Sequence, residues 1–211
     1  AIINKKNFEI TTLRQDIFTD GRHAKVQFTS DWKQDALRRD FTINAIYADI
    51  DGQIFDPLSG ISDLIKGAVK FIGNPVERIQ EDYLRILRYF RFFSHYSKIT
   101  HEDKTIQAIK SNIDGLNKIA QERKFDELQK ICKLKNVNNL FLDHTSRNVF
   151  LIIFPQLKHY NRLKRLQELN KATIERLDEL FILALLVVDS SDNYEYFCHK
   201  YKTSRKIKDR F

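Results

Sequence analysis

The sequence predicts an α+β fold in which short strands and helices are followed by a mostly helical remainder. Two observations lead to this class. Five of the six glycines and two of the three prolines fall within the first 75 of the 211 residues. Both residue types end regular elements, so the front should consist of short elements joined by turns. From Glu81 onward, apolar residues recur with a helical period, which predicts helices to the end of the chain.

Strands are predicted in the front part from alternation and from β-forming residues. The segment NFEITTLR, residues 7–14, alternates in this way. The segment AIYADI at 45–50 is followed by Asp51-Gly52 and QIFDP, a pattern typical of a hairpin with a tight turn. A further short strand is predicted for AVKFIG at 68–73.

Helices are predicted from capping residues and from period. The segment at 62–67 should be a short helix with Ser62 at its N-cap and Gly67 ending it. Thr100 and Asp103 suggest a capping box for a helix near 101–113. Three further helices are predicted at 81–93, 121–134 and 179–188.

Composition limits the class of protein. Hydrophobic content of 42% and charged content of 30% are ordinary for a soluble globular chain. A net charge of +8 and a pI near 9.4 favour a polyanionic partner such as nucleic acid or nucleotide. The longest apolar run, 181–188, is too short to cross a membrane. The chain starts with Ala1 and contains no methionine, which indicates a fragment.

Cysteine usage and the N-terminus bear on the compartment. The two cysteines, Cys132 and Cys198, have no ligand-like spacing, so neither a disulfide framework nor a zinc site is predicted. The first residues do not resemble a signal peptide. We therefore expect a reducing compartment: the cytoplasm, or an organellar matrix in a eukaryote.

The segment EDYLRILRYFRFF at 81–93 places arginines in an apolar helix. On a helical wheel one arc collects Tyr83, Ile86, Leu87, Phe90 and Phe93. Asp82 and Arg85 are then neighbours, one turn apart, at the edge of this arc. A carboxylate that accepts beside a guanidinium that donates can match the edge of cytosine or adenine, while Arg88 and Arg91 suit a triphosphate. The alternative, which pattern alone favours, is a surface ion pair with two solvated arginines.

Two further segments carry candidate residues. In LRRDFTINA, Arg38, Arg39 and Asp40 precede an apolar stretch and can position phosphate and ribose, although an ordinary charged turn has the same pattern. Glu9 lies within the predicted first strand and could join a metal cluster. One carboxylate alone does not hold catalytic Mg²⁺ dependably, and such a glutamate more often faces water.

Taken together, these segments resemble the class II tRNA nucleotidyltransferase and bacterial poly(A) polymerase family. RRDFTINA resembles motif B, the stretch from Asp56 to Leu64 motif C, and the stretch from Glu81 to Arg85 motif D. ERKFDEL at 122–128 resembles a later neck motif, and FEITTLRQD and DGRHAKVQFTSD resemble the strand and loop before motif B. The resemblance weakens beyond about residue 130.

The resemblance implies a partial nucleotidyltransferase head with a mixed β-sheet at 1–80, a helical neck with a nucleotide-templating helix at 81–135, and a helical body at 136–211. Within the family, motif D templates the incoming CTP or ATP, which falls here on Asp82 and Arg85. The other positions that the resemblance assigns to nucleotide binding are Arg39, Asp40 (for ribose selection), Arg88 and Arg91. Glu9 matches the carboxylate that accompanies the metal-binding pair.

The resemblance also implies chemistry and partners. Two Mg²⁺ ions would activate the primer 3′-hydroxyl and steady the leaving pyrophosphate. The glycine-rich motif A with its D-x-D metal ligands has no counterpart here. The Mg²⁺ ligands are therefore expected mostly outside this chain, and the chain alone is expected to be inactive unless a missing N-terminal segment or a companion chain supplies them. The expected partners are the tRNA 3′ end and nucleoside triphosphates, with no membrane.

Three functions remain open from the sequence. Addition of C and A nucleotides to tRNA is favoured by the wording of FDPLSG and EDYLRILRYFRF. Addition of A only, or poly(A) synthesis, shares the same motifs. A non-catalytic remnant that binds nucleotide or RNA is favoured by the lack of motif A and opposed by intact motifs B and D.

Overall fold

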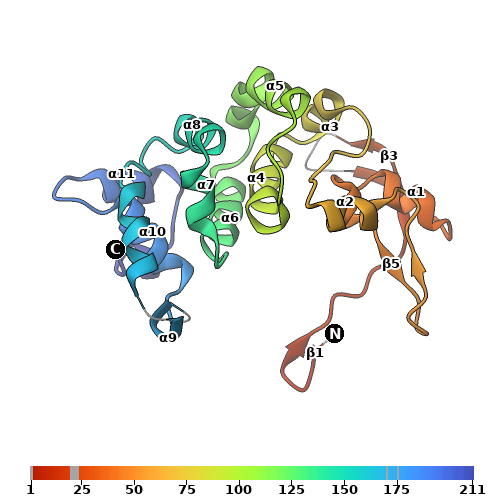
Figure 1. The fold of residues 1–211 in the computed structure, drawn as a ribbon, viewed down its shortest axis with the longest axis horizontal. Coiled ribbons are helices and arrows are strands. Elements are labelled where there is room, and N and C mark those ends of the chain that lie inside the picture. Colours follow the sequence, from red (N-terminus) through yellow and green to blue (C-terminus); the bar gives the residue numbers. More distant parts are fainter. Residues whose placement is uncertain (1, 20–23, 170, 175) are drawn as a thin grey trace.

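The computed structural model describes residues 2–19, 24–169, 171–174 and 176–211. These residues form an elongated arch (Figure 1), with the strands and α1–α3 at one end, α4–α6 in the middle and α7–α11 at the other end. The N-terminal hairpin extends away from the arch. None of the helices in this described part is long and apolar enough to cross a membrane.

The strands form three separate antiparallel pairs. Their bounds are β1 Ile2–Ile3, β2 Lys6–Asn7, β3 Arg14–Thr19, β4 Ala24–Phe28, β5 Tyr47–Ala48 and β6 Ile54–Phe55. The α+β class is confirmed, but the predicted mixed sheet is replaced, among the described residues, by these two-stranded sheets. The hairpin predicted around Asp51-Gly52 is confirmed, with Tyr47 opposite Phe55 and Gly52 at φ 82°.

Two predicted strands are wrong. Residues 8–13 belong to no helix or strand, so the strand predicted at 7–14 is reduced to its two ends. Alternation alone does not make a strand, because the backbone needs a hydrogen-bonded neighbour. The strand predicted at 68–73 is reduced to one isolated bridge, between Phe71 and Phe41.

The helices that form the front and the middle of the arch are α1 Trp32–Leu37, η1 Thr42–Asn44, α2 Gly60–Lys66, α3 Pro75–Glu81, α4 Arg85–Tyr96, α5 Asp103–Asn112, η2 Ile113–Lys118 and α6 Gln121–Cys132. Those of the far end are α7 Val137–Leu142, α8 His144–Ile153, η3 Tyr160–Glu168, α9 Lys171–Ile174, α10 Glu179–Val187, α11 Asn193–Lys200 and α12 Arg205–Lys208. The domain boundaries predicted at 80 and 135 stay predictions.

The helix predicted at 81–93 is two helices. Helix α3 ends before Asp82, whose backbone is extended (φ −152°), and α4 begins at Arg85. The carboxylate of Asp82 accepts from the backbone N of Leu84 at 3.1 Å, which satisfies one of the free N–H groups where the next helix starts. The buried face of α4 includes Tyr89 beside the predicted Ile86, Leu87 and Phe90, whereas Tyr83 and Phe93 are only half-buried.

The other predicted helices are present, with different caps. Helix α2 starts at Gly60, before the predicted cap Ser62, and the carboxylate of Asp56 accepts from the N–H of Gly60 at 2.7 Å and of Ile61 at 2.9 Å. Gly67 ends it at φ 68°, as predicted. Helix α5 has Glu102, not Thr100, at its N-cap position. The helices predicted at 121–134 and 179–188 are confirmed as α6 and α10.

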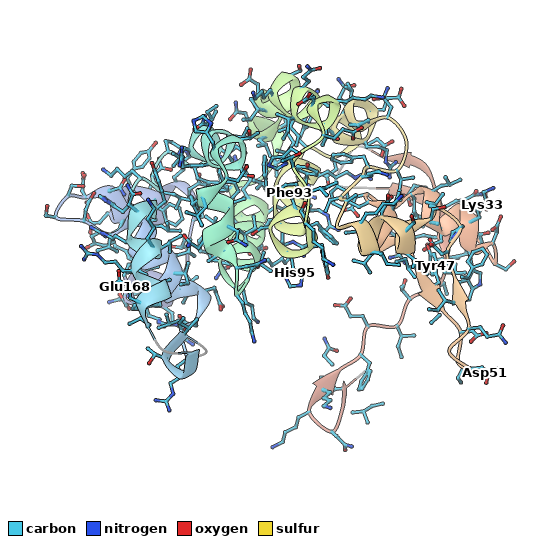
Figure 2. All side chains as sticks on the ribbon, viewed as in Figure 1. Lys33, Tyr47, Asp51, Phe93, His95 and Glu168 are labelled. Carbon is cyan, nitrogen blue, oxygen red and sulfur yellow. The ribbon has the colours of Figure 1, made fainter. Side chains whose placement is uncertain are left out.

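One buried apolar cluster runs through the arch, from Phe41 at the front to Tyr201 near the C-terminal end. Aromatic contacts link its parts: Phe41 lies 4.9 Å from Phe71, and Phe71 stacks on Tyr89 at 5.9 Å. Figure 2 shows side chains along the whole arch, with Tyr47 at the strand end, Phe93 on α4 and Glu168 at the far end. The front and the helical remainder therefore share one core.

His101, just before α5 and with a side chain 7% exposed, joins helix α4 to the start of α8. The Tyr89 hydroxyl lies 2.9 Å from Nδ1 of His101, and Nε2 lies 3.0 Å from an Asp143 oxygen and 2.8 Å from Ser146 Oγ. Phe93 stacks on the ring at 3.6 Å. Burial lowers the pKa of His101 below its ordinary value, against the opposing effect of Asp143. The neutral imidazole is therefore the form that the fold selects.

This histidine predicts an acid-sensitive stability. A histidine whose folded pKa is depressed contributes stability above its unfolded pKa of about 6.5, and that contribution is lost as the pH falls towards the folded pKa. We expect the urea midpoint to drop from pH 8 to pH 5, and the part of the drop just below pH 6.5 to be absent in His101→Gln. Identical pH profiles for the two proteins would contradict this role for His101.

Candidate functional site

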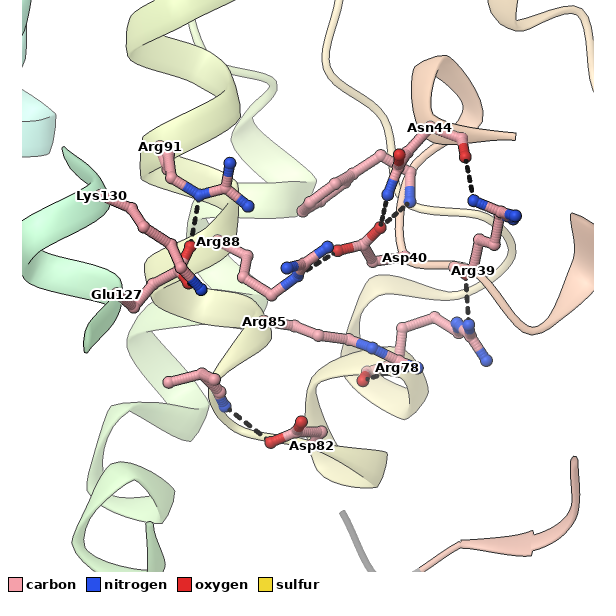
Figure 3. Close-up of polar contacts among 12 residues, drawn as sticks. Arg39, Asp40, Asn44, Arg78, Asp82, Arg85, Arg88, Arg91, Glu127 and Lys130 are labelled. Atoms are coloured by element: carbon pink, nitrogen blue, oxygen red, sulfur yellow. Dashed lines mark hydrogen bonds and ion pairs between the residues drawn. The ribbon is translucent and has the colours of Figure 1, made fainter. Parts of the chain in front are cut away.

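The candidate site lies where residues 38–45 meet the turn between α3 and α4 (Figure 3). Helix α1 positions the first of these segments: Asp31 caps its start by accepting from Lys33 N at 2.8 Å, and the chain leaves its end at Arg38. Phe41, fully buried, then holds the segment against the core. Arg39 and Asp40 are thus placed between a helix end and a buried anchor.

Asp40 and Arg88 form the central ion pair. Asp40 is 5% exposed, and Nε of Arg88 donates to its Oδ2 at 2.5 Å. Oδ1 accepts from Asn44 at 3.0 Å. Burial alone would raise the pKa of Asp40, but the charge and hydrogen bond of Arg88 outweigh it and leave the pKa below its ordinary value. The carboxylate is therefore ionised, and its orientation is fixed by Asn44, four positions away, and by Arg88, 48 positions away.

Glu81 balances two arginines on the α3 side of the site. Its carboxylate lies 2.5 Å from Nη1 of Arg85 and 2.6 Å from Nη1 of Arg78. Arg78 also donates to the backbone carbonyl of Arg38 at 2.8 Å and to that of Arg39. Burial and the charge of Arg85 lower the pKa of Arg78. Helix α3 is therefore tied to the end of α1 through Arg78.

Asp82 and Arg85 do not lie on one helix as predicted, because α3 ends at Glu81 and α4 begins at Arg85; they remain one turn apart, and the Arg85 backbone N donates to the Asp82 carbonyl at 3.0 Å. Their side chains have separate partners. Oδ2 of Asp82 accepts from Nη2 of Arg123, on α6, at 2.8 Å, whereas Arg85 turns back to Glu81. At the break, residues 82–84, the other oxygen of Asp82 accepts from the backbone N of Leu84, the residue just before α4. Asp82 and Arg85 both lie at the turn between α3 and α4.

Arg91 lies further along α4 and faces α6. It pairs with Glu127, which is 1% exposed and also lies 3.3 Å from Lys130 Nζ. The solvated arginines of the alternative interpretation are therefore not found: each of Arg85, Arg88 and Arg91 has an acidic partner. Those partners lie in three different segments, α3, the loop after α1 and α6, which the sequence of one helix could not reveal.

Glu9 is not part of this arrangement. It is exposed and lies in the segment 8–13, outside any strand. Within the described ranges, no group of three or more His, Cys, Asp or Glu side chains could hold a metal ion. The residues described here thus do not by themselves fit a Mg²⁺ centre.

Two family models match the chain. Residues 1–70 match the poly A polymerase head domain, and residues 99–161 match the probable RNA- and SrmB-binding site of polymerase A. A CCA-adding enzyme of Streptococcus gordonii is 33% identical over 210 residues, which cover 98% of this chain and 52% of that protein. This chain belongs to the tRNA nucleotidyltransferase and poly(A) polymerase family.

Other proteins similar to this chain are also CCA-adding enzymes by name. The human mitochondrial CCA tRNA nucleotidyltransferase 1 is 50% identical over 145 residues, 66% of this chain and 33% of that protein. A structure of the Bacillus stearothermophilus CCA-adding enzyme in complex with CTP matches 99% of this chain and 51% of its own, with a TM-score of 0.64 and 26% identity. An apo CCA-adding enzyme at 22% identity and a TM-score of 0.70 shares the fold. The chain spans about a third to a half of the length of these curated relatives.

The stretch that resembles motif C, from Asp56 to Leu64, contacts Thr42 in the stretch that resembles motif B. Asp63 is 6% exposed and accepts from the Thr42 hydroxyl at 2.8 Å and from Lys70 Nζ at 2.7 Å. A Cβ on Gly60 would lie 2.2 Å from the carbonyl oxygen of Thr42. The glycine of motif C is therefore needed so that α2 can approach η1 closely.

Gly60→Ala is expected to destabilise the protein by about 2 kcal/mol, because the added methyl group meets backbone and not a flexible side chain. The free energy of unfolding from urea titration measures this. Gly73→Ala is a spatial control, since no atom lies within 4 Å of the place that its Cβ would take. Its positive φ of 81° adds only backbone strain of about 1 kcal/mol. An effect of Gly60→Ala no larger than that of Gly73→Ala would show that crowding against Thr42 is not the cause.

Several residues of the site escaped the sequence interpretation: Asp35, Tyr47, Arg78, Glu81, Arg123 and Glu127. Three of them left a local signal. Asp35 precedes Arg38 and Arg39 by three and four positions, and Glu81 lies three positions after Arg78 and four before Arg85, which are the spacings of neighbours on a helix. Arg123 and Glu127 lie 41 and 36 residues from their partners Asp82 and Arg91. The segment 122–128 that contains them resembles a neck motif, but nothing in its pattern indicates these two pairs.

Proposed function

We propose that the protein to which this chain belongs adds C and A nucleotides, from CTP and ATP, to the 3′ end of tRNA, and that protein side chains select the base. The relatives named above are CCA-adding enzymes, and one similar structure holds CTP. A structure of the Thermotoga maritima CCA-adding enzyme with tRNA shares the fold. The proposed partners are therefore the tRNA 3′ end and the two nucleoside triphosphates.

The charge balance around motif B is the observation that carries this proposal. Arg38, Arg39, Arg78, Arg85 and Arg88 pair with only three carboxylates, those of Asp35, Asp40 and Glu81. The described part of the site therefore keeps an excess of positive charge, held on partly buried guanidinium groups. Such groups suit the oxygens of a triphosphate.

The proposed roles follow from this placement. Asp82 and Arg85, at the turn between α3 and α4, contact the base edge. Arg39, Arg88 and Arg91 attract phosphate, and Asp40 lies near the ribose. Asp82 and Arg85 would each exchange a partner, Arg123 or Glu81, for the base.

Metal chemistry needs more than the described residues. We propose that Mg²⁺ assists the reaction with ligands mostly beyond this chain, provided by a further segment or a companion chain, and that Glu9 would accompany them. The chain alone is then inactive. We also propose the cytoplasm or an organellar matrix as its compartment; one relative is named mitochondrial, and Cys132 and Cys198 are both free and buried.

The test offers the full-length protein, and this chain alone, a tRNA that lacks its 3′ CCA, with labelled CTP, ATP or both. We expect C and then A to be incorporated by the full-length protein and nothing by the chain alone. Incorporation of A without C would point to A-only or poly(A) addition instead. Nucleotide binding without any incorporation by the full-length protein would point to a non-catalytic binding protein.

A further inference from the structure

Asp35 lies at the centre of a compact polar cluster next to motif B, and it belongs to none of the motifs considered above. It is 1% exposed, on α1. Its Oδ1 accepts from Nε of Arg38 at 2.8 Å and from the backbone N of Arg14 at 3.2 Å. Its Oδ2 accepts from Nη2 of Arg39 at 3.1 Å and from the Tyr47 hydroxyl at 2.8 Å. Each oxygen thus serves a different arginine.

Tyr47 completes the cluster from strand β5. Its hydroxyl donates to Asp35 and accepts from Nε of Arg39 at 3.0 Å, and the guanidinium carbon of Arg39 lies 5.0 Å from the centre of its ring. Burial, together with the hydrogen bond to Asp35, raises the pKa of Tyr47 to about 12. The phenol therefore stays protonated and can keep both bonds at any working pH. Trp32 packs edge-on against this ring at 5.1 Å.

The guanidinium of Arg39 is fixed by hydrogen bonds but keeps N–H groups available for a ligand. Nη1 donates to the backbone carbonyl of Asn44 at 3.1 Å, a contact drawn in Figure 3. A guanidinium has five N–H groups, so one on each terminal nitrogen has no partner among the described residues. The side chain of Arg39 is 33% exposed and that of Asp35 only 1%. A buried anion therefore fixes a guanidinium whose outer edge remains open to a ligand.

The charges of the cluster do not cancel. Arg38 and Arg39 are two cations on one carboxylate, and the nearest further acid of the segment, Asp40, is bound to Arg88. One positive charge therefore remains, on a guanidinium whose direction is set before any ligand arrives. Preorganised charge of this kind raises affinity, because the side chain is already ordered by folding.

We infer that Asp35 and Tyr47 are positioning residues that aim Arg39 at the phosphate groups shared by ATP and CTP. The inference rests on the proposed function for its ligand, but the positioning itself does not depend on catalysis. Because the phosphates are common to both nucleotides, loss of the contacts that Asp35 and Tyr47 make with Arg39 should weaken the binding of ATP and of CTP equally. That distinguishes Asp35 and Tyr47 from Asp82 and Arg85, which are proposed to contact the base.

The first measurement tests positioning without any nucleotide. In the ¹⁵N-labelled chain, the Nε–H signal of Arg39, assigned by its loss in Arg39→Lys, should be protected from exchange with water. We expect Asp35→Asn to abolish this protection, because an amide offers one acceptor where two arginines and a phenol need two. Tyr47→Phe should reduce it. Unchanged protection in Asp35→Asn would overturn the inference.

The second measurement is calorimetric titration of the same chain with ATP and with CTP. We expect Asp35→Asn to raise both dissociation constants about tenfold, the cost of losing a charge-assisted bond, and Tyr47→Phe to raise them by roughly threefold. In an Arg39→Ala background neither substitution should have a further effect, because both act through Arg39. Asp51→Asn, an exposed carboxylate on the β5–β6 turn, is the matched control and should change nothing.

The outcomes separate the two proposals. Tight binding by the unmodified chain that is unchanged in a folded Asp35→Asn variant would overturn the inference while the proposed function stands. An additive effect in the Arg39→Ala background would show that Asp35 acts through the fold and would also overturn it. Absence of ATP and CTP binding in the unmodified chain would overturn phosphate as the target of Arg39, whatever the signal of Arg39 shows; the proposed function is tested separately, by nucleotide incorporation with the full-length protein.

Discussion

Asp40→Ala is expected to lower the free energy of unfolding by about 3 kcal/mol, because it leaves the guanidinium of Arg88 without its partner in a largely buried place. Asp40 is 5% exposed and Arg88 28% exposed, so little water can replace the lost carboxylate. The bond also joins the segment after α1 to α4. We therefore expect the front of the chain to unfold more readily than the helical remainder, which hydrogen exchange measures by segment.

The double variant Asp40→Leu/Arg88→Met separates this pair from the rest of the fold. Removing both charges together should restore most of the lost stability. Asp209→Ala, which breaks an exposed pair with Arg205 at 3.9 Å, should cause no measurable change. Since the folded pKa of Asp40 is depressed, its contribution is present above the unfolded pKa of about 3.9 and is lost as the pH falls through the folded value. An Asp40→Ala variant as stable as the unmodified protein at pH 7 would show that the pair contributes nothing.

Asp82→Ala and Arg85→Ala are expected to degrade the choice between C and A by about tenfold to a hundredfold, the range for a lost bidentate contact to a base edge. The measurement is the ratio of kcat/KM for CTP and ATP on tRNA, with the full-length protein. The concentration of Mg²⁺ that gives half-maximal activity should not change, because neither residue is proposed as a metal ligand.

The matched control is the pair Arg205→Ala and Asp209→Ala, another arginine and aspartate, exposed at α12 and its C-terminal end. Neither should alter the choice of nucleotide. Arg123→Ala adds a specific check, because Arg123 holds the carboxylate of Asp82 in place. If Asp82→Ala and Arg85→Ala both keep normal discrimination, the templating role is wrong. If Arg123→Ala disturbs discrimination while Asp82→Ala does not, Arg123 and not Asp82 influences the choice of nucleotide.

Part of the site could be predicted from the sequence because its residues are close neighbours along the chain. Arg38, Arg39 and Asp40 are consecutive; in the structure Arg38 and Arg39 share the partner Asp35, whereas Asp40 pairs with Arg88. The helix at 81–93 failed for a local reason as well. The period of apolar residues is the same whether one helix runs through residues 82–84 or one helix ends there and a second begins. The carboxylate of Asp82 favours the second arrangement, because it accepts from the backbone N of Leu84.

The sequence by itself determined the α+β class, the hairpin at Asp51-Gly52, and the helices α6 and α10. These follow from turn residues and from the period of apolar residues, which act over a few positions. Only the tertiary structure decided the partners: Asp40 for Arg88, Arg123 for Asp82 and Glu127 for Arg91. Those choices depend on which segments burial brings together, and an ion pair formed across 36 to 48 residues leaves no periodic trace in the chain.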